Sequence, residues 1–457
     1  MVKGLFRFRM NIKQKATALV AGLALLACAV LGVSSAYMAR EGTMALQTKS
    51  LSALRDARKD ELHHYFETID QDITLWAQSP ITIDAIRDFG AAWGEIGGNP
   101  QQTLQQVYIQ DNPHPAGQKD NMTESSSAPE AYGKAHVKYH PKLKLLKDQR
   151  GYYDIFLFDT AGNLVYSVYK EADFATNFVN GTYSSSGLGE VFRAAQSGSI
   201  GFTDFAPYAP SNGAAASFIS RQVLDANGQQ IGVIAFQMPI DRMDAILNES
   251  RSLGEGGGLT MVGVDNLMRH NSVKYGEGSI LTTRVENEAI SKAIAGEKGV
   301  IQTIDALGAP VLAAYAHLDF HGVRWAFMAE QTLSYVLRPV KDLQRTMALT
   351  TGLLMIGVLL VAWLISRGAV RPIIGIQEAV HRLSEGQDVE VPGRGRHDEI
   401  GELARSMEHV YLKGLEAARL RAALDDCSTL SSSPTGATRS CSATTGCGSS
   451  SADTPRR

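Results

Sequence analysis

The chain lacks the features by which an enzyme or a nucleic-acid-binding protein is usually found. It has four cysteines in 457 residues and none between positions 40 and 346, so a domain there would fold without disulfides. The 44 Lys and Arg residues do not outnumber the 47 Asp and Glu residues, so no basic excess points to nucleic acid. The sequence shows no paired nucleophile and base, no phosphate-binding loop and no metal-ligand cluster. We therefore expect no enzyme activity, no cofactor and no bound metal.

Two histidines come nearest to a metal site. His136 and His140 stand four residues apart, but no carboxylate accompanies them at a fixed spacing. We therefore expect these two side chains to lie on a solvated helix face.

Two long apolar runs are the most informative feature that is present. Residues 16–36 and 347–365 carry no charge, and each is long enough for a helix to cross a bilayer core of about 30 Å. Lys and Arg residues precede the first run, so the positive-inside rule keeps residues 1–15 in the cytoplasm and places residues 40–345 outside. Cleavage of the first run at the small residues 34–36 is the alternative, and it leaves the outside region unchanged. The sequence thus predicts two transmembrane helices around a large external domain.

A single long helix is expected after the first run, over residues 40–79, with Pro80 ending it. Its apolar side chains repeat at alternating spacings of four and three residues: Leu62, Phe66, Ile69, Ile73 and Trp76. This stripe either packs on the domain that follows or pairs with a second copy of the chain.

Two successive blocks of strands follow, each with one helix inside it. The first block predicts a helix at 187–197 and five strands, at 152–159, 164–170, 201–206, 215–224 and 230–238. The second predicts a helix at 287–295 and five strands, at 258–264, 267–272, 300–304, 311–317 and 323–329. Each block therefore predicts a five-stranded antiparallel sheet, with the long N-terminal helix covering both sheets. Before them, residues 97–130 are rich in Gly, Pro, Gln, Ser and Asn and predict an irregular excursion.

This order of elements resembles the double Cache domain, an extracellular sensor fold of bacterial chemoreceptors and sensor kinases. The resemblance also draws on FTDFAPYAPSNG at 202–213 and GVIAFQMPID at 232–241. It implies an α+β periplasmic domain over residues 40–345, built of two PAS-like modules on a long helix. The membrane-distal module, about 80–250, would hold a ligand pocket, and the proximal module, about 255–330, would serve as a relay.

The distal module is the richer in side chains suited to a small ligand, because tyrosine offers a flat ring and a hydroxyl and arginine grips a carboxylate. Alternating tyrosines on strands are also ordinary sheet surface. We expect ligand contacts from seven residues: Tyr152, Asp154, Tyr166, Tyr169, Asp204, Tyr208 and Arg221. Tyr153 and Lys170 belong to the same polar group.

Amino-acid-binding Cache domains carry Pro-Tyr followed two residues later by an Asp that pairs with the ligand ammonium. Pro207 and Tyr208 fit this pattern, but the third position is Pro210. An amino-acid ligand is therefore less favoured, and carboxylates, other small metabolites and periplasmic binding proteins stay open.

Two short amphipathic segments follow the second apolar run, joined by a connector of about a dozen residues. They resemble a HAMP domain, placed at residues 367–420. The resemblance rests on a proline opening the first segment and on the start of the second: Pro372, Asp398, Glu399, Gly401 and Leu403. It implies a parallel homodimer in which a four-helix coiled-coil bundle relays the signal, with Glu399 as the control residue at the joint.

The end of the sequence shows no recognisable output domain. Residues 421–429 resemble the lead-in to a PAS domain, and residues 430–457 have too little apolar content to bury a core. We expect a disordered tail there, and hypothesise that it arises from a shifted reading frame.

The leading interpretation is a bacterial methyl-accepting chemotaxis protein in the inner membrane, truncated before its signalling domain. Its full-length form would engage a cytoplasmic histidine kinase and a coupling protein. The alternative is the sensor half of a membrane histidine kinase or diguanylate cyclase.

Overall fold

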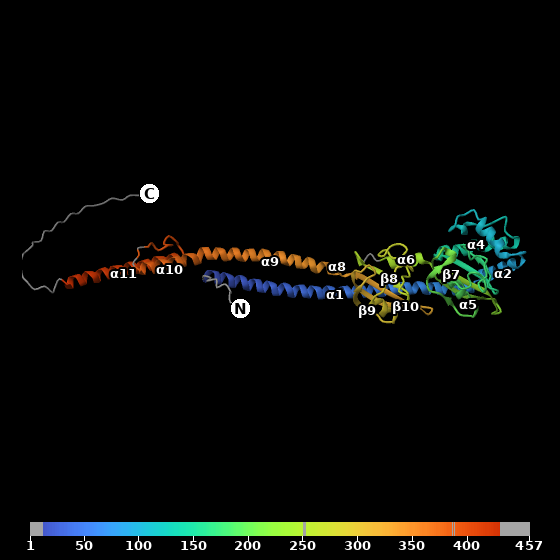
Figure 1. Cartoon of the computed structure of the whole chain (residues 1–457), viewed down its shortest axis with the longest axis horizontal. Helices are drawn as coiled ribbons and strands as arrows, with labels where there is room; N and C mark the ends of the chain where they lie inside the picture. Colours follow the sequence, from blue (N-terminus) through green and yellow to red (C-terminus); the bar gives the residue numbers. More distant parts are fainter. Residues whose placement is uncertain (1–11, 250–252, 386, 388, 430–457) are drawn as a thin grey trace, which may run out of the picture. The chain divides into compact units, whose positions relative to one another are not determined.

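The computed structural model describes residues 12–249, 253–385, 387 and 389–429 (Figure 1). One compact unit comprises Gly32–Thr346, and the other comprises Met1–Leu31 with Met347–Arg457. The first unit contains all the strands of the described chain, and the second is helical. The mixed α/β class predicted from the sequence is therefore confirmed. The predicted tail at 430–457 lies outside the described residues.

Helix α1 (Ile12–Ala77) forms a common wall for both sheets of the larger unit (Figure 1). The predicted helix over 40–79 is confirmed, and its apolar stripe is the buried face, as Leu62, Phe66, Ile69 and Ile73 show. Pro80 does not continue α1 but opens the next helix, α2 (Pro80–Glu95), whose N-cap is Ser79.

The distal module contains the predicted five-stranded antiparallel sheet, in the order β2-β1-β7-β6-β3. The strands are β1 (Asp154–Asp159), β2 (Leu164–Ser167), β3 (Gly201–Phe202), β6 (Phe218–Leu224) and β7 (Gln230–Gln237). Helix α5 (Gly187–Gln196) packs on one face, and α2 with α4 (Glu130–Arg150) covers the other. Alternation along β1 sends Phe156 and Phe158 to the α5 side and Ile155 and Leu157 to the α2 and α4 side.

Two predicted strands of this module are broken, and their ends form a separate ribbon. The strands expected at 201–206 and 215–224 are interrupted, and β4 (Ala206–Tyr208) pairs with β5 (Ala214–Ala216) outside the main sheet. At the break, the Ser217 hydroxyl donates to the Thr203 carbonyl. This side-chain bond takes the place of a ladder bond.

Residues 97–130 contribute to the core instead of forming only an excursion. They include α3 (Pro100–Gln105), the π-helix η1 (Gln106–Gln110) and the 3-10 helix η2 (Lys119–Asn121). Leu104 and Tyr108 are fully buried. The segment therefore folds back over α4, which sequence composition did not predict.

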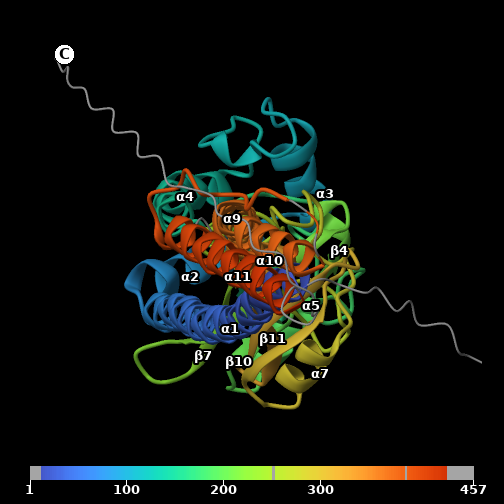
Figure 2. The same cartoon turned by 90° about the vertical axis from the view of Figure 1, so that its left-hand side faces the viewer.

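The proximal module has a four-stranded antiparallel sheet in the order β8-β11-β10-β9. Its strands are β8 (Gly258–Val262), β9 (Gly299–Ile304), β10 (Pro310–Phe320) and β11 (Val323–Thr332). Helix α7 (Glu288–Ile294) covers β10 and β11 on one face (Figure 2). On the other face, Phe66 of α1 packs against Phe320 and Trp325. Helix α6 (Ile240–Asn248) connects the two modules.

The fifth strand predicted at 267–272 is wrong. This segment makes only isolated bridges, such as Val262 with Met268. Its polar side chains and amides are engaged elsewhere, since Asn271 bonds to Asp244 and the Ser272 amide bonds to the Ser279 hydroxyl. The start of the segment still makes two backbone bonds beside β8, from the Gly263 amide to the Leu267 carbonyl and from the Arg269 amide to the Met261 carbonyl. Beyond them, the side-chain bonds replace the ladder that the alternating sequence pattern predicted.

The smaller unit contains α10 (Arg371–Ser384) and α11 (Glu399–Thr429), preceded by the π-helix η5 (Ser366–Val370) and by α9 (Arg338–Ile365). Ile376 and Leu383 of α10 bury against Ala404 of α11. A short helix, α8 (Leu333–Val336), joins β11 to α9. By length and composition, the helical stretches Ala21–Ala77 and Arg338–Ser384 each could cross a membrane.

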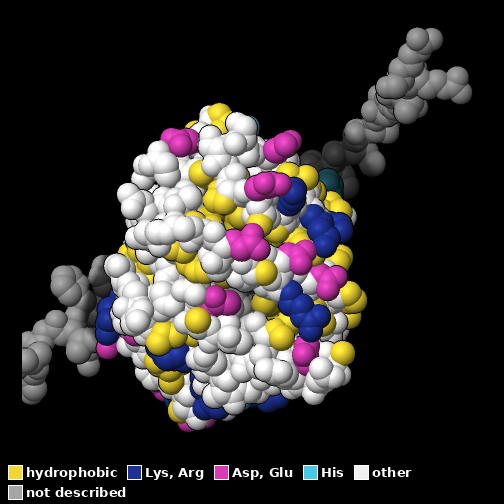
Figure 3. Space-filling model, turned by 90° about the vertical axis from the view of Figure 1, so that its right-hand side faces the viewer, with side chains coloured by type: hydrophobic (Ala, Val, Ile, Leu, Met, Phe, Trp, Pro, Cys, Tyr) yellow, Lys and Arg dark blue, Asp and Glu magenta, His cyan; other side chains and the backbone are white. Residues whose placement is uncertain are grey.

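The surface of the larger unit is mixed in character. Figure 3 looks onto its α2 and α4 end, where hydrophobic and acidic side chains are interspersed and Lys and Arg side chains lie in small separate groups. A surface of this kind is ordinary for a domain that faces water.

Candidate ligand-binding site

A cavity of about 720 Å³ lies where the distal module meets α6 and the proximal module. Its distal wall comes from the residues before β1 and after β2, from the β4 and β5 ribbon and from the end of β7. Its proximal wall comes from Asn271, Gly278 and residues 280–282. Its lining residues include Tyr152, Tyr153, Tyr169, Gln237, Ile280 and Leu281. The volume is within the range of roughly 300–1,000 Å³ that is usual for small-molecule sites. We call this cavity the inter-module cleft.

Two tyrosines form an aromatic wall in the inter-module cleft. The rings of Tyr153 and Tyr169 lie 4.8 Å apart, and the Lys147 ammonium lies 5.3 Å from the centre of the Tyr169 ring. The Tyr153 hydroxyl donates to Glu171 at 2.8 Å. Burial and the nearby Glu171 carboxylate raise the pKa of Tyr153 well above its usual value, so the hydroxyl remains protonated.

Tyr152 connects the cleft directly to α1. Its hydroxyl donates to Asp72 of α1 at 2.8 Å, and its ring stacks on Phe236 with centroids 4.5 Å apart. Arg150 also contacts the Asp72 carboxylate, at 2.9 Å. A displacement of Tyr152 in the cleft would therefore shift or break its hydrogen bond to Asp72 of α1.

Gln237 lines the cleft and has a buried, unused hydrogen-bonding group in its side chain. Its side chain is 2% exposed, and its Oε1 has no hydrogen-bond partner among the residues that the structure describes. Buried polar atoms are nearly always paired. A ligand that donates a hydrogen bond would satisfy this oxygen. The residue lies in the 232–241 strand noted from the sequence, but nothing in the sequence singled it out.

Three ionisable side chains lie in the interior of the distal module: Asp154, Lys170 and Asp173 are all fully buried. Asp154 accepts bonds from the Ser167 hydroxyl at 2.7 Å and from the Tyr169 amide at 3.0 Å. Burial raises the pKa of Asp154 to about 7. Tyr153, just before β1, lines the cleft, while Asp154, the first residue of β1, is buried in the interior, so two successive residues serve two different environments.

Tyr208 of the Pro-Tyr pair forms a hydrogen bond with a carboxylate from another part of the chain. The amino-acid-binding pattern has its Asp at position 210, where this chain has a proline. The Tyr208 hydroxyl donates to Asp173 Oδ2 at 2.6 Å, and Asp173 Oδ1 has no partner in the described parts of the chain. Burial raises the pKa of Asp173 to about 8. Asp173 was not predicted, because its approach to Tyr208 is a tertiary contact across 35 residues.

The expectation that His136 and His140 lie on a solvated helix face is wrong. Both are fully buried, and their rings stack 4.4 Å apart. His140 bonds through Nδ1 to the Tyr166 hydroxyl at 2.7 Å and through Nε2 to the Asp120 carbonyl at 2.8 Å. Burial lowers the pKa of His140 to about 2, so the ring is neutral. Across the described residues, no three His, Cys, Asp or Glu side chains are placed to hold a metal.

The other two predicted contacts, Asp204 and Arg221, lie outside the cleft. Asp204 accepts a bond from the Trp325 indole at 2.7 Å and two bonds from Arg269 at 3.0 and 2.8 Å, which ties the distal module to the proximal one. Arg221 donates to Thr74 of α1 at 3.0 Å. Of the seven predicted residues, Tyr152 and Tyr169 therefore line the cleft, while Asp154, Tyr166 and Tyr208 lie in the interior.

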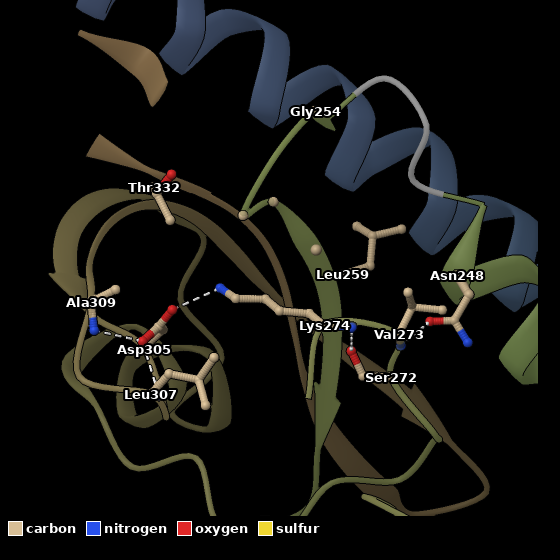
Figure 4. A pocket seen from close by; sticks show the side chains of 13 residues that line it. Asn248, Gly254, Leu259, Ser272, Val273, Lys274, Asp305, Leu307, Ala309 and Thr332 are labelled. Carbon is tan, nitrogen blue, oxygen red and sulfur yellow. Dashed lines mark hydrogen bonds and ion pairs between the residues drawn. The ribbon is translucent and has the colours of Figure 1, made fainter. Parts of the chain in front are cut away.

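A second cavity, of about 450 Å³, lies in the proximal module (Figure 4). The Lys274 side chain crosses it, and its ammonium contacts Asp305 at 2.9 Å and Glu330 at 2.8 Å. Tyr275 donates to the same Glu330 oxygen at 2.6 Å. Because this ammonium is already paired, the cavity offers a ligand less than the cleft does.

The predicted relay residues sit at the starts of the two helices of the smaller unit. Pro372 is in the first turn of α10, and Glu399 is the first residue of α11. Asp398 accepts the Gly401 amide at 3.0 Å, and the Arg396 guanidinium holds the Asp398 pKa down at about 2. A Cβ on Gly401 would lie 2.1 Å from the Arg396 carbonyl, so this turn requires glycine. Leu403 is 40% exposed.

Comparisons with known proteins identify one domain. A family model described as HAMP domain matches residues 364–411, which confirms the HAMP prediction. No curated protein matches the chain in sequence.

Several solved structures are similar to the chain in fold. That of a protein described as the histidine kinase rpHK1S-Z16 is 15% identical, with a TM-score of 0.40, covering 65% of this chain and 98% of that one. The ligand-binding domain of Pseudomonas fluorescens chemoreceptor CtaA, with L-isoleucine, is 14% identical, with a TM-score of 0.35 and coverage of 65% and 95%. That of Campylobacter jejuni chemoreceptor Tlp3, with L-valine, is 9% identical, with a TM-score of 0.39 and coverage of 65% and 98%. Residues 364–411 thus match a HAMP domain, and the chain is similar in fold to the extracellular domain of a histidine kinase and to the ligand-binding domains of two chemoreceptors.

Proposed function

We propose that the chain is a bacterial transmembrane receptor that binds a small ligand outside the inner membrane and passes the signal inward through its HAMP domain. The observation that carries this proposal is the HAMP match at 364–411, which overlaps the end of the apolar helix α9. A helical bundle with two packings can be biased by a small shift of the helix that enters it. The mixed domain that precedes α9 is then the part that receives the ligand.

The two apolar runs at 16–36 and 347–365 are proposed as membrane spans, with a large periplasmic domain of the double Cache type between them. Both runs lie in helices long and apolar enough to cross a bilayer. Within this class we favour a methyl-accepting chemotaxis receptor, supported by the PAS-like lead-in at 421–429. A histidine kinase or diguanylate cyclase sensor is the alternative. The downstream DNA separates them by whether it encodes a long heptad hairpin or a catalytic domain.

We place the ligand in the inter-module cleft. The Tyr153 and Tyr169 rings suit a flat apolar part, and the unpaired Gln237 oxygen suits a hydrogen-bond donor. A ligand there would touch both modules at once. It would also displace Tyr152, whose hydroxyl is bonded to Asp72 of α1. The cleft thus joins ligand binding to the helix that continues into the first apolar run.

The ligand site is tested by replacing Gln237 with leucine in the full chain and screening metabolites by thermal shift. We expect any ligand that raises the Tm of the wild type to lose that effect in Gln237→Leu, because the bond to Oε1 is gone. Without ligand the variant should be as stable as the wild type or more so, since an unpaired buried oxygen costs about 1–3 kcal/mol.

Gln222→Leu is the matched control, because this glutamine lies on β6 outside the cleft. It should respond to the same ligand as the wild type does. A ligand that stabilises Gln237→Leu as strongly as the wild type would move the site away from the cleft. If no metabolite acts on either protein, a periplasmic binding protein becomes the favoured partner.

The HAMP proposal predicts a parallel homodimer joined along α10. Ile373 is 44% exposed in the single chain, which leaves an apolar side chain for a second copy to cover. In a background without native cysteines, we expect Ile373→Cys to form a disulfide-linked dimer readily in membranes. Glu378→Cys, on the polar face of the same helix, should do so far more slowly. Equal cross-linking at both positions, or none across residues 373–383, would contradict a parallel bundle.

A further inference from the structure

Lys170 is a wholly buried amine in the distal module. Its side chain is 0% exposed, and its backbone has φ of 57°, in the left-handed region that a side chain rarely adopts. Lys147 and Lys274 are also largely buried, but each contacts two carboxylates. Lys170 instead forms no ion pair with any residue in the described part of the chain. A buried cation without an ionic partner is costly and calls for another explanation.

The Lys170 ammonium lies in a cage of rings from three different elements. Its Nζ is 5.3 Å from the centre of the Tyr166 ring on β2 and 5.7 Å from that of Tyr108 on η1. It donates to the Val168 carbonyl at 3.2 Å and lies 3.4 Å from Nδ1 of His140 on α4. Ring faces attract a cation but not a neutral amine. The cage therefore distinguishes the two protonation states of Lys170.

The histidine in the cage has a defined tautomer. His140 Nε2 faces the Asp120 carbonyl at 2.8 Å, which can only accept, so the proton is on Nε2. Nδ1 is then an acceptor for the Tyr166 hydroxyl and for Lys170. Burial keeps the pKa of both His136 and His140 well below the usual value, so neither ring competes for a proton near neutral pH.

Other charged groups face Lys170 from the elements packed around it. Asp154 on β1 and Asp120 on η2 favour the ammonium, while Lys144 and Lys147 on α4 oppose it. Burial is the largest effect and lowers the pKa of Lys170 to about 7. Both protonation states are thus populated in the pH range that a bacterium meets.

We propose that the distal module senses external pH through Lys170, with the proton as its ligand. When the amine is neutral, η1, β2 and α4 pack around it without a buried charge. When the amine takes up a proton, a cation without an ionic partner is buried there, the attraction of the two ring faces offsets only part of its cost, and the elements loosen. The change reaches the inter-module cleft through Tyr169, the residue next to Lys170, whose amide is bonded to Asp154. This function is separate from ligand binding at Gln237.

The sign of the pH dependence of stability follows from the pKa of Lys170 in the folded chain and its pKa in the unfolded chain. An unfolded lysine has a pKa of about 10.4, so between pH 7 and that value the unfolded chain binds a proton that the folded chain releases. The contribution of Lys170 to stability therefore rises as pH increases through this window. Below pH 7 both states are protonated, and the contribution is flat.

The test compares the wild-type full chain with Lys170→Met, which keeps the length of the side chain but cannot titrate. Unfolding is followed by tryptophan fluorescence in detergent micelles from pH 5.5 to 9.5. Between pH 7.5 and 9.5, the unfolding equilibrium constant of the wild type should fall about tenfold per pH unit relative to Lys170→Met. The control Lys298→Met, an exposed lysine in the other module, should keep the wild-type profile.

A second measurement covers the case in which Lys170→Met fails to fold. NMR of the wild type with 13Cε-labelled lysine should show one resonance that titrates near pH 7, and this resonance should be missing in Lys170→Arg. Identical pH profiles for the wild type and Lys170→Met, or lysine resonances that all titrate above pH 9.5, would overturn the proposal. Neither readout uses a cleft ligand, so the result is independent of the Gln237 test.

Discussion

Replacing Phe66 by alanine should lower the free energy of unfolding of the larger unit by about 3–5 kcal/mol. Phe66 is fully buried on α1, where its ring lies 5.1 Å from that of Phe320 and 5.4 Å from that of Trp325. Truncation to alanine removes the ring from between α1 and the proximal sheet and leaves a cavity. Neighbouring rings cannot close this cavity, because Trp325 is held by its bond to Asp204.

Chemical unfolding of the full chain in detergent, followed by tryptophan fluorescence, gives the free energy for this variant. Leu75→Ala is the matched control on the same helix, since Leu75 is 65% exposed and should change stability by no more than about 0.5 kcal/mol. A loss below 1 kcal/mol in Phe66→Ala would mean that α1 is not packed on the proximal sheet as described.

Replacing Lys274 by methionine should cost about 3–5 kcal/mol, because it leaves buried carboxylates without their cation. The side chains of Asp305 and Glu330 are 1% and 0% exposed, and the Lys274 ammonium contacts both of them; Figure 4 shows its contact with Asp305. Burial already raises the pKa of Glu330 above its usual value in the presence of Lys274. Without the ammonium this pKa rises further, and Glu330 takes up a proton instead of remaining charged.

The loss of stability in Lys274→Met should therefore be larger at higher pH. A carboxyl whose pKa is raised in the folded state binds a proton that the unfolded chain releases, so its contribution to stability falls as pH rises from the unfolded pKa of about 4.3 to the folded one. We expect a larger loss at pH 8 than at pH 5.5, measured by denaturant unfolding.

The triple variant Lys274→Met, Asp305→Asn, Glu330→Gln removes the buried charges together and should recover part of the loss. It should also abolish the difference between the two pH values. A loss in Lys274→Met that is the same at both values would show that the cluster acts only through packing. Lys298→Met serves again as the exposed control.

Local periodicity predicted the parts of the fold that depend on one element at a time. The buried face of α1 follows from the spacing of Leu62, Phe66, Ile69 and Ile73, because a helix repeats every 3.6 residues whatever lies against it. Residues 267–272 failed the same kind of inference. Their alternation is real, but Asn271 and Ser272 bond to side chains from other segments instead of to a neighbouring strand.

The interior of the distal module could not be predicted in this way. His136 and His140 are buried because residues 104–122 fold over α4 and supply the Asp120 carbonyl. That contact depends on tertiary structure, and the Gly- and Ser-rich composition of the segment does not indicate it. The unpaired oxygens of Gln237 and Asp173 are likewise properties of burial and not of residue type.

Asp204 shows most clearly why site residues are harder to predict than strands. The sequence offers a carboxylate near Pro-Tyr, which is a reasonable ligand contact. In the folded chain this carboxylate bonds to Arg269, 65 residues away, and to Trp325, 121 residues away. Its partners come from the second module, so only the folded domain reveals what it holds together.

The wall that α1 provides for both sheets bears on how the larger unit comes apart. Neither module has a complete core of its own, because α1 closes one face of the proximal sheet and its last turns join α2 and α4 in the core of the distal module. Cooperative units of unfolding are sets of elements that share buried surface. The two modules have separate sheets, but we expect them to unfold together as one cooperative unit. Removing or exchanging one module would expose the core of the other.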